Sequence, residues 1–108
     1  MGKNEKVRED LQPLAEVNKV IHEPARLLIL AHLSVVERAD FLFLERQTGL
    51  TRGNLSTHLS KLEAAGYVEI KKEFVGKIPR TLLHLTKQGK KAFQKYLKSM
   101  KQVIDNLS

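Results

Sequence analysis

The residues with the most chemistry to offer lie in one short segment, 51–66, which reads TRGNLSTHLSKLEAAG. On a helix of 3.6 residues per turn, Leu55, Leu59 and Leu62 form one apolar stripe, and small polar side chains occupy the opposite side. Hydroxyl and amide groups of this size let a helix enter a nucleic-acid groove and hydrogen-bond base edges and phosphates. Ser and Thr also collect at helix starts simply because they cap them, so the segment alone supports both interpretations.

The glycine at position 53 favours the binding interpretation. A glycine inside a helix costs about 1 kcal/mol relative to alanine, and close approach of the backbone to a phosphate would be a reason to keep it. His58 lies at the margin of the polar side, where it would contact a phosphate or simply pack. The residues expected to bind DNA from this helix, with Thr51 and the adjacent amides holding a phosphate, are Thr51, Arg52, Gly53, Asn54, Ser56, Thr57, His58, Ser60 and Lys61.

The segment just upstream predicts a second short helix over 40–48. Asp40 is a suitable N-cap, and Gly49 stands where a left-handed residue would end the helix. Thr51 then caps the next helix after a tight turn. Two short helices joined in this way form a helix-turn-helix, in which the second helix enters the major groove.

The segment just downstream predicts a β-hairpin, because the hydrophobic period changes from 3.6 to 2 after Gly66. We expect strands over 67–74 and 81–86 joined by a turn over 75–80, although Lys72 breaks the apolar face of the first strand. Lys77 and Arg80 lie in the turn, where they would contact the DNA backbone or the adjacent minor groove, as a wing does. Basic residues at a hairpin tip can also merely protect a sheet edge from aggregation.

The rest of the chain predicts three more helices. An apolar run over 23–33 begins with proline and should be buried in the lobe; its Arg26 pairs with Asp40, binds a helix-end carbonyl or faces water. Helices over about 4–21 and 87–107 carry apolar residues at spacings of three and four, which would pack on each other, on a second copy, or both. The expected dimer interface consists of Leu11, Leu14, Phe93, Leu97, Met100, Ile104 and Leu107.

Composition predicts one small domain, 1–108, with the DNA-binding lobe over about 23–90. The chain has 108 residues, 42% of them hydrophobic, a size that profits from oligomerisation. Residues 51–108 hold 12 Lys and Arg against 4 Asp and Glu, a net +8, whereas residues 1–50 hold 7 against 8, a net −1, which together give the total of +7. A basic half of this kind is typical of a protein that binds a polyanion. The absence of cysteine is consistent with a cytoplasmic protein but is permitted in any compartment, and the absence of a long apolar stretch indicates neither export nor membrane insertion.

Catalytic and metal-binding patterns are lacking in the sequence. The four histidines, 22, 32, 58 and 84, are separated by 10, 26 and 26 residues, unlike the short spacings of zinc sites. No glycine-rich phosphate loop and no Gly-x-Ser-x-Gly motif occurs. The sequence therefore predicts neither an enzyme nor a protein with a cofactor or metal.

At this point the chain, from about Glu23 to Lys90, resembles the small winged-helix transcriptional regulators of the MarR/ArsR type. The resemblance implies a winged helix-turn-helix of mainly α structure with a small β-hairpin (α+β) and with dimerisation helices at both ends. It rests on Ala39-Asp-Phe41, Thr48-Gly-Leu-Thr51, Gly53-Asn-Leu-Ser56, His58-Leu59, Lys61-Leu-Glu63, Gly66-Tyr-Val68, Phe74, Gly76, Pro79-Arg-Thr81, Leu85-Thr86 and Gly89.

The same resemblance implies a homodimeric, sequence-specific repressor or activator of a prokaryotic cytoplasm, bound to a palindromic double-stranded operator. Metal-sensing members bind through cysteines, which this chain lacks, and many MarR-type members hold small aromatic ligands, so the identity of a small-molecule effector stays open. Two other functions remain compatible with the residues. One is a non-specific architectural or chromatin protein, and the other is a protein-interaction wing without DNA affinity.

Overall fold

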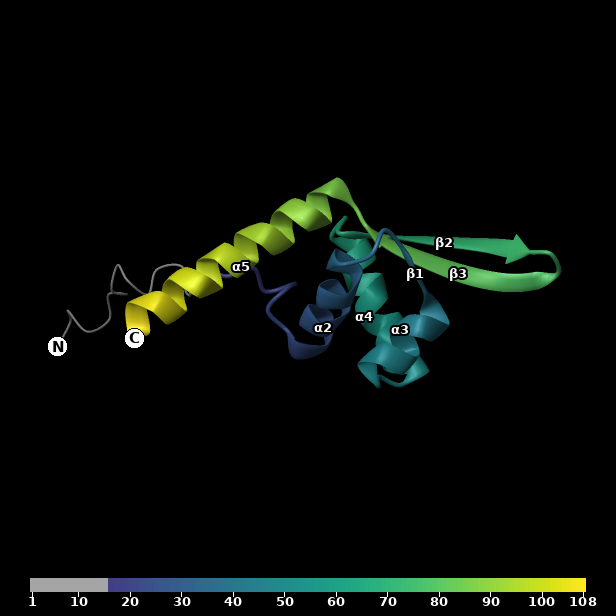
Figure 1. The fold of residues 1–108 in the computed structure, drawn as a ribbon, viewed down its shortest axis with the longest axis horizontal. Helices are drawn as coiled ribbons and strands as arrows, with labels where there is room; N and C mark the ends of the chain where they lie inside the picture. Colours follow the sequence, from purple (N-terminus) through teal and green to yellow (C-terminus); the bar gives the residue numbers. More distant parts are fainter. Residues whose placement is uncertain (1–15) are drawn as a thin grey trace.

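The computed structural model describes residues 16–108, which form four helices and a three-stranded antiparallel sheet (Figure 1). The expected class, mainly α with a β-hairpin, is confirmed. None of these residues belongs to a helix that is both long and apolar enough to cross a membrane. The helices are α2 (Pro24–Ser34), α3 (Phe41–Thr48), α4 (Arg52–Ala64) and α5 (Lys87–Leu107), and the strands are β1 (Ala39–Asp40), β2 (Val68–Val75) and β3 (Ile78–Leu85).

The helix boundaries follow the capping residues. Asp40 accepts a hydrogen bond from the N–H of Leu42 at the start of α3, and Gly49 ends that helix with φ of 71°. Thr51 caps α4 and Thr86 caps α5, each through its side-chain oxygen. The helix-turn-helix predicted from these positions is confirmed for α3 and α4.

The hairpin β2–β3, which we call the wing, is longer than expected. β3 begins at Ile78 rather than at residue 81, and it pairs with β2 from Val68–Leu85 to Val75–Ile78. The turn therefore contains only Gly76 and Lys77, and the predicted turn over 75–80 is too long, since 75 belongs to β2 and 78–80 belong to β3. Proline is tolerated in a strand without a hydrogen-bonded neighbour on its N–H side. Position 79 meets this condition because β1 pairs with β3 only at 82 and 83.

The helix predicted over about 4–21 is wrong at its described end, 16–21, which is irregular. The side-chain oxygen of Asn18 accepts hydrogen bonds from the N–H groups of Val20 and Ile21, at 3.0 and 3.2 Å. A local turn of this kind competes with the helical backbone pattern. The remainder of the predicted helix lies outside the described residues.

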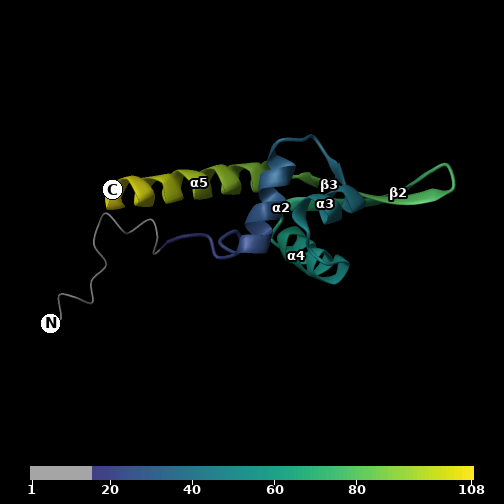
Figure 2. The ribbon, with the colours of Figure 1, turned by 60° about the horizontal axis from the view of Figure 1, so that its bottom comes forward.

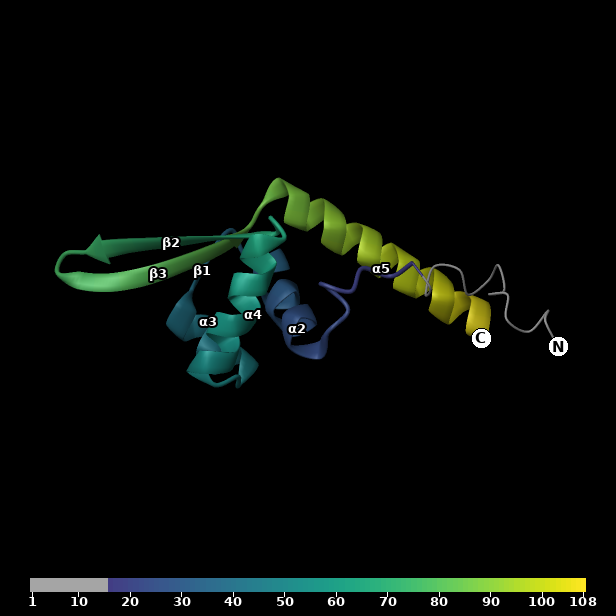
Figure 3. The ribbon, with the colours of Figure 1, turned by 180° about the vertical axis from the view of Figure 1, so that it is seen from behind.

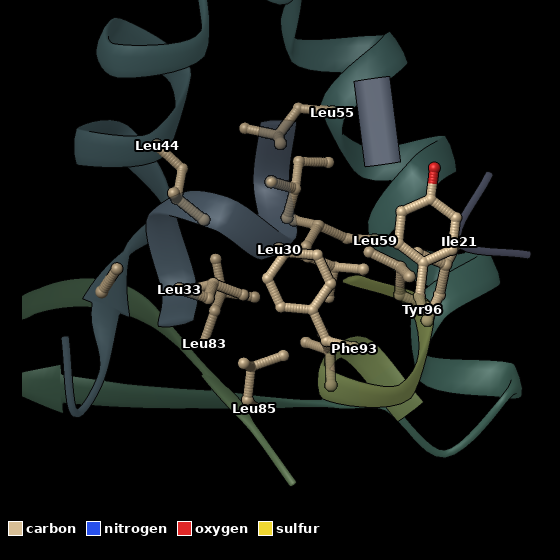
Figure 4. Packing of buried hydrophobic residues seen from close by; sticks show 14 residues of the cluster. Ile21, Leu30, Leu33, Leu44, Leu55, Leu59, Leu83, Leu85, Phe93 and Tyr96 are labelled. Carbon is tan, nitrogen blue, oxygen red and sulfur yellow. The ribbon is translucent and has the colours of Figure 1, made fainter. Parts of the chain in front are cut away.

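The core forms where α2, α3, α4, the sheet and the first turns of α5 meet (Figure 4). The leucine stripe of α4 is fully buried there, as predicted, with Leu55, Leu59 and Leu62 each at most 1% exposed. From α5, Phe93 and Tyr96 also pack into this core. Phe93, one of the residues expected at a dimer interface, is thus only 7% exposed in a single chain.

The wing and α5 extend in opposite directions from the helical lobe (Figures 1 and 3). Turning the molecule shows α4 at the lower edge of the lobe, below α2 and α3 (Figure 2). The first turn of α5 is fastened to the start of the wing, where the N–H of Thr86 donates to the carbonyl of Tyr67 over 3.0 Å. The fold thus places one exposed helix beside a projecting hairpin.

Candidate nucleic-acid interface

The outer face of α4 is made of the small polar residues that the sequence singled out. Thr51 uses its hydroxyl to accept from the N–H of Asn54 over 3.2 Å, and Thr57 donates its hydroxyl to the carbonyl of Gly53 over 2.9 Å. These local bonds leave the side chains on the surface. The exposed residues of the predicted set on this helix and its cap are Thr51, Arg52, Gly53, Asn54, Ser56, Thr57, Ser60 and Lys61.

A groove of about 820 Å³ separates α4 from the wing and the start of α3. Its lining combines polar and basic side chains with apolar ones. It brings together four of the predicted DNA-binding residues, one of them on the wing, and leaves Asn54, Thr57 and Lys61 on the open flank of α4. Its lining is Asp40, Phe41, Leu42, Arg52, Ser56, Leu59, Ser60, Ile70, Lys72, Ile78, Pro79, Arg80, Thr81 and Leu83.

Arg80 lies within β3 rather than at the tip of the wing. Its Nε donates to Oδ2 of Asp40 over 3.1 Å, and its side chain remains 43% exposed. Burial by itself would raise the pKa of Asp40, but the hydrogen bond from Leu42 N–H and the Arg80 guanidinium outweigh it and hold the pKa below its usual value. The pair therefore holds a cation at the edge of the groove.

Lys72 is a groove residue that the sequence reasoning did not assign. It lies opposite Thr81 in the wing and, like Arg80, lines the groove. Its signal was present in the sequence, because it interrupts the apolar face of β2. Lys77 remains at the tip, as expected, within the two-residue turn.

His58 points away from the open face of α4 and toward α2. Its Nδ1 is 3.1 Å from Nη1 of Arg26, and its Nε2 is 4.0 Å from Oε2 of Glu23. Arginine can only donate, so Nδ1 of His58 is the acceptor in this contact. The hydrogen bond from Arg26 N–H lowers the pKa of Glu23 below its usual value. This placement favours packing over phosphate contact for His58.

Of the partners expected for Arg26, the structure shows a backbone carbonyl. Its Nε donates to the carbonyl of Val20, which lies in the irregular segment rather than at a helix end. An ion pair with Asp40 is wrong, because Asp40 pairs with Arg80. Arg26 thus links the start of α2 to α4.

The residues expected at a dimer interface divide into three groups. Leu97, Ile104 and Leu107 are 48%, 61% and 67% exposed on α5. Met100 is partly buried against the core, together with the buried Phe93. Leu11 and Leu14 lie outside the described residues.

Known proteins resemble this chain over the same helices and strands. The profile of a family described as winged helix DNA-binding domain matches residues 25–104. The Methanocaldococcus jannaschii protein MJ0432 is 36% identical over 89 residues, 82% of this chain and 97% of that one. A Pyrococcus horikoshii OT3 structure described as a transcriptional regulator homologue has a TM-score of 0.84 and 32% identity, over 94% of this chain and 99% of the other. A MarR-family transcriptional regulator structure from Enterococcus faecalis V583 shares the fold, with a TM-score of 0.69 and 22% identity over 82% and 79% of the two chains.

Proposed function

Because the chain belongs to the winged helix DNA-binding domain family, we propose that it is a homodimeric regulator of transcription that reads a specific double-stranded DNA sequence. The fold is that of transcriptional regulators, including members of the MarR family. The observation that carries the proposal is the surface of α4, where exposed alcohol and amide groups lie opposite a buried leucine stripe. A helix of this kind can approach base edges without long side chains holding it away.

In the proposed complex, α4 lies in the major groove. Asn54 and Thr57 on its open flank, with Lys61, are placed to reach base edges or phosphates there. Thr51 and Arg52 at the helix start contact the phosphate backbone, where the exposed N-terminal amides also favour negative charge. Ser56 and Ser60 face the groove beside the wing and contact the same strand.

The wing follows the backbone toward the adjacent minor groove. Lys72 and Arg80 line the groove between the wing and α4, and Lys77 lies at the tip. A strand of DNA crossing this groove would meet basic groups on both sides, from Arg52 on α4 and from the wing. These contacts supply affinity and orientation, while the α4 side chains supply sequence discrimination.

Self-association of two copies through α5 would complete the DNA-binding dimer. Leu97 and Ile104 are exposed and one heptad apart, and Leu107 continues their row toward the end of the helix. Burial of solvent-exposed leucine and isoleucine side chains lowers the free energy, which favours association. Two copies paired there would present two α4 helices to sites about 34 Å apart, one turn of DNA, and would select a palindrome.

Selection of bound fragments from a pool of random duplex DNA tests the proposal directly. A regulator of this kind enriches a palindromic sequence, and it binds that sequence about 1,000-fold or more tighter than random DNA. Affinity for a shuffled site within a few-fold of the selected one would instead indicate a non-specific architectural protein. Absence of salt-dependent DNA binding would indicate a wing that contacts protein.

Matched variants separate base recognition from attraction to the DNA backbone. Asn54→Ala and Thr57→Ala should each weaken binding to the selected duplex by about 1 to 3 kcal/mol where the side chain hydrogen-bonds a base, with little effect on random DNA. Lys77→Ala should weaken both and reduce the slope of log affinity against log salt by about 0.9. Gln94→Ala, an exposed change on α5, serves as the control. Equal losses on both DNAs for all three variants would contradict the division of roles.

A further inference from the structure

The tip of the wing is apolar on both faces. Phe74 lies opposite Pro79, and Val75 lies opposite Ile78. Residues opposite each other share a face of a hairpin, and successive residues alternate faces. One pair therefore projects from each side of the two-residue turn, and we call these four residues the apolar tip.

This apolar tip is open to solvent. Phe74, Val75 and Ile78 are 73%, 48% and 67% exposed, and the wing projects past the helices of the lobe (Figures 1 and 3). A hairpin does not require apolar residues at its tip. Exposed strand edges commonly carry charged residues, which prevent aggregation. Exposed apolar clusters framed by polar residues usually mark contact sites.

The charges around the apolar tip are basic. Lys77 stands at its apex, and Lys72 and Arg80 follow along the strands toward the lobe. The cross-strand partner of Arg80 is Glu73, the one acidic residue adjoining the tip. Two copies meeting tip to tip would bring their Lys77 ammonium groups together, which disfavours self-association at this site. A polyanion with apolar surface between its charges fits the same arrangement.

We propose that the apolar tip enters the minor groove of duplex DNA as a wedge, with Phe74 and Ile78 against the faces of partly unstacked bases. The inference rests on the proposed DNA-binding function and adds to it a mode of contact. Apolar side chains inserted between base steps kink the duplex by about 20–90° in architectural proteins. Lys77 and Lys72 contact the phosphates on either side of the insertion.

Because the chain contains no tryptophan, a single tryptophan introduced at the tip gives a fluorescence signal for insertion. In Phe74→Trp, the emission of the indole should be quenched and shielded from acrylamide when a random-sequence duplex of about 30 base pairs is added, a length within the range of bent protein sites. Gln94→Trp is the control; it is exposed on α5, the helix that extends away from the wing (Figure 1), and it should stay accessible to acrylamide. A random-sequence probe makes the test independent of any operator.

Loss of the ring tests the energetic role. Phe74→Ala should bind the same duplex about tenfold more weakly, because the aromatic ring no longer stacks on a base. Energy transfer between dyes at the two duplex ends should rise with the wild-type chain and rise less with Phe74→Ala. Ile78→Ala provides a second variant, and unfolding curves verify that each variant folds.

Three results would overturn the inference. If the duplex binds and the Phe74→Trp indole stays accessible, the wedge is wrong while the proposed function stands. If the indole becomes shielded without DNA as protein concentration rises, a second copy covers the tip. If no duplex binds at any salt concentration, the proposed function fails and the wedge fails with it.

Discussion

Arg80 of β3 donates from Nε to Oδ2 of Asp40 over 3.1 Å, which ties the wing to the residue that caps α3. The same carboxylate accepts from the N–H of Leu42 over 2.7 Å. One side chain therefore sets both the start of the helix-turn-helix and the position of a wing cation. Asp40 and Arg80 both line the groove between α4 and the wing.

Two substitutions at position 40 should separate these roles. Asp40→Asn keeps the cap and removes the ion pair, so we expect a loss of less than about 1 kcal/mol in the free energy of unfolding, because the pair is partly exposed. Asp40→Ala removes both and should lose about 1 kcal/mol more. Urea unfolding measures both changes, and equal effects of the two variants would contradict the capping role.

The contribution of Asp40 should depend on pH. Its pKa in the folded state lies below its ordinary value of 3.8, so its stabilisation is fully present above that value and is lost as pH falls through the lowered folded pKa. The stability gap between wild type and Asp40→Asn should therefore be constant near neutral pH and close in acid. Unfolding curves from neutral pH down to acid provide the measurement, and a gap that widens in acid would refute this assignment.

Gly53→Ala should stabilise the protein and weaken DNA binding. A Cβ added at Gly53 meets no other atom within 4 Å, so helix propensity should raise the free energy of unfolding by up to about 1 kcal/mol. In the proposed complex the backbone at Gly53 lies against a phosphate, where the added methyl group interferes. Thermal unfolding tests the expected rise in stability, and DNA titration of the same preparation tests the expected fall in affinity. Unchanged affinity would remove the phosphate contact at this position.

Gly89→Ala should be strongly destabilising. A Cβ at this position would clash with the backbone oxygen of Tyr67, where α5 crosses the start of the wing. Relief requires a backbone shift, and such overpacking commonly costs about 1–3 kcal/mol. Urea unfolding provides the measurement, with Gly53→Ala as the glycine-to-alanine control of opposite sign. Stability equal to that of the wild type would mean that this contact is loose.

Charge on the exposed row of α5 should separate the proposed dimer. The double variant Leu97→Asp with Ile104→Asp places two carboxylates where apolar side chains are expected to meet a second copy. Sedimentation should then give the mass of one chain instead of two, and affinity for a palindromic duplex should fall toward that of a half-site. Gln94→Asp on the same helix is the charge control. A single-chain mass for the wild type would sink the dimer proposal.

Local sequence was sufficient for most elements of the fold. Asp40, Gly49, Thr51 and Thr86 mark helix ends through bonds to nearby backbone groups, so their effect is readable without knowing the rest of the molecule. The buried stripe of α4 and its exposed polar face follow from a 3.6-residue period in the same way. These features identified the candidate reading helix.

Contacts between distant segments were decided only by the tertiary structure. The partner of Arg80 is 40 residues away, and the Arg26 guanidinium that draws His58 toward α2 is 32 residues away. At residues 16–21, a side-chain turn at Asn18 stands where the apolar spacing predicted the end of a helix. Sequence by itself determined which residues form elements and which faces are apolar, because those properties depend on near neighbours. Packing of the elements determined which charges meet, because that depends on where separate segments come to lie in space.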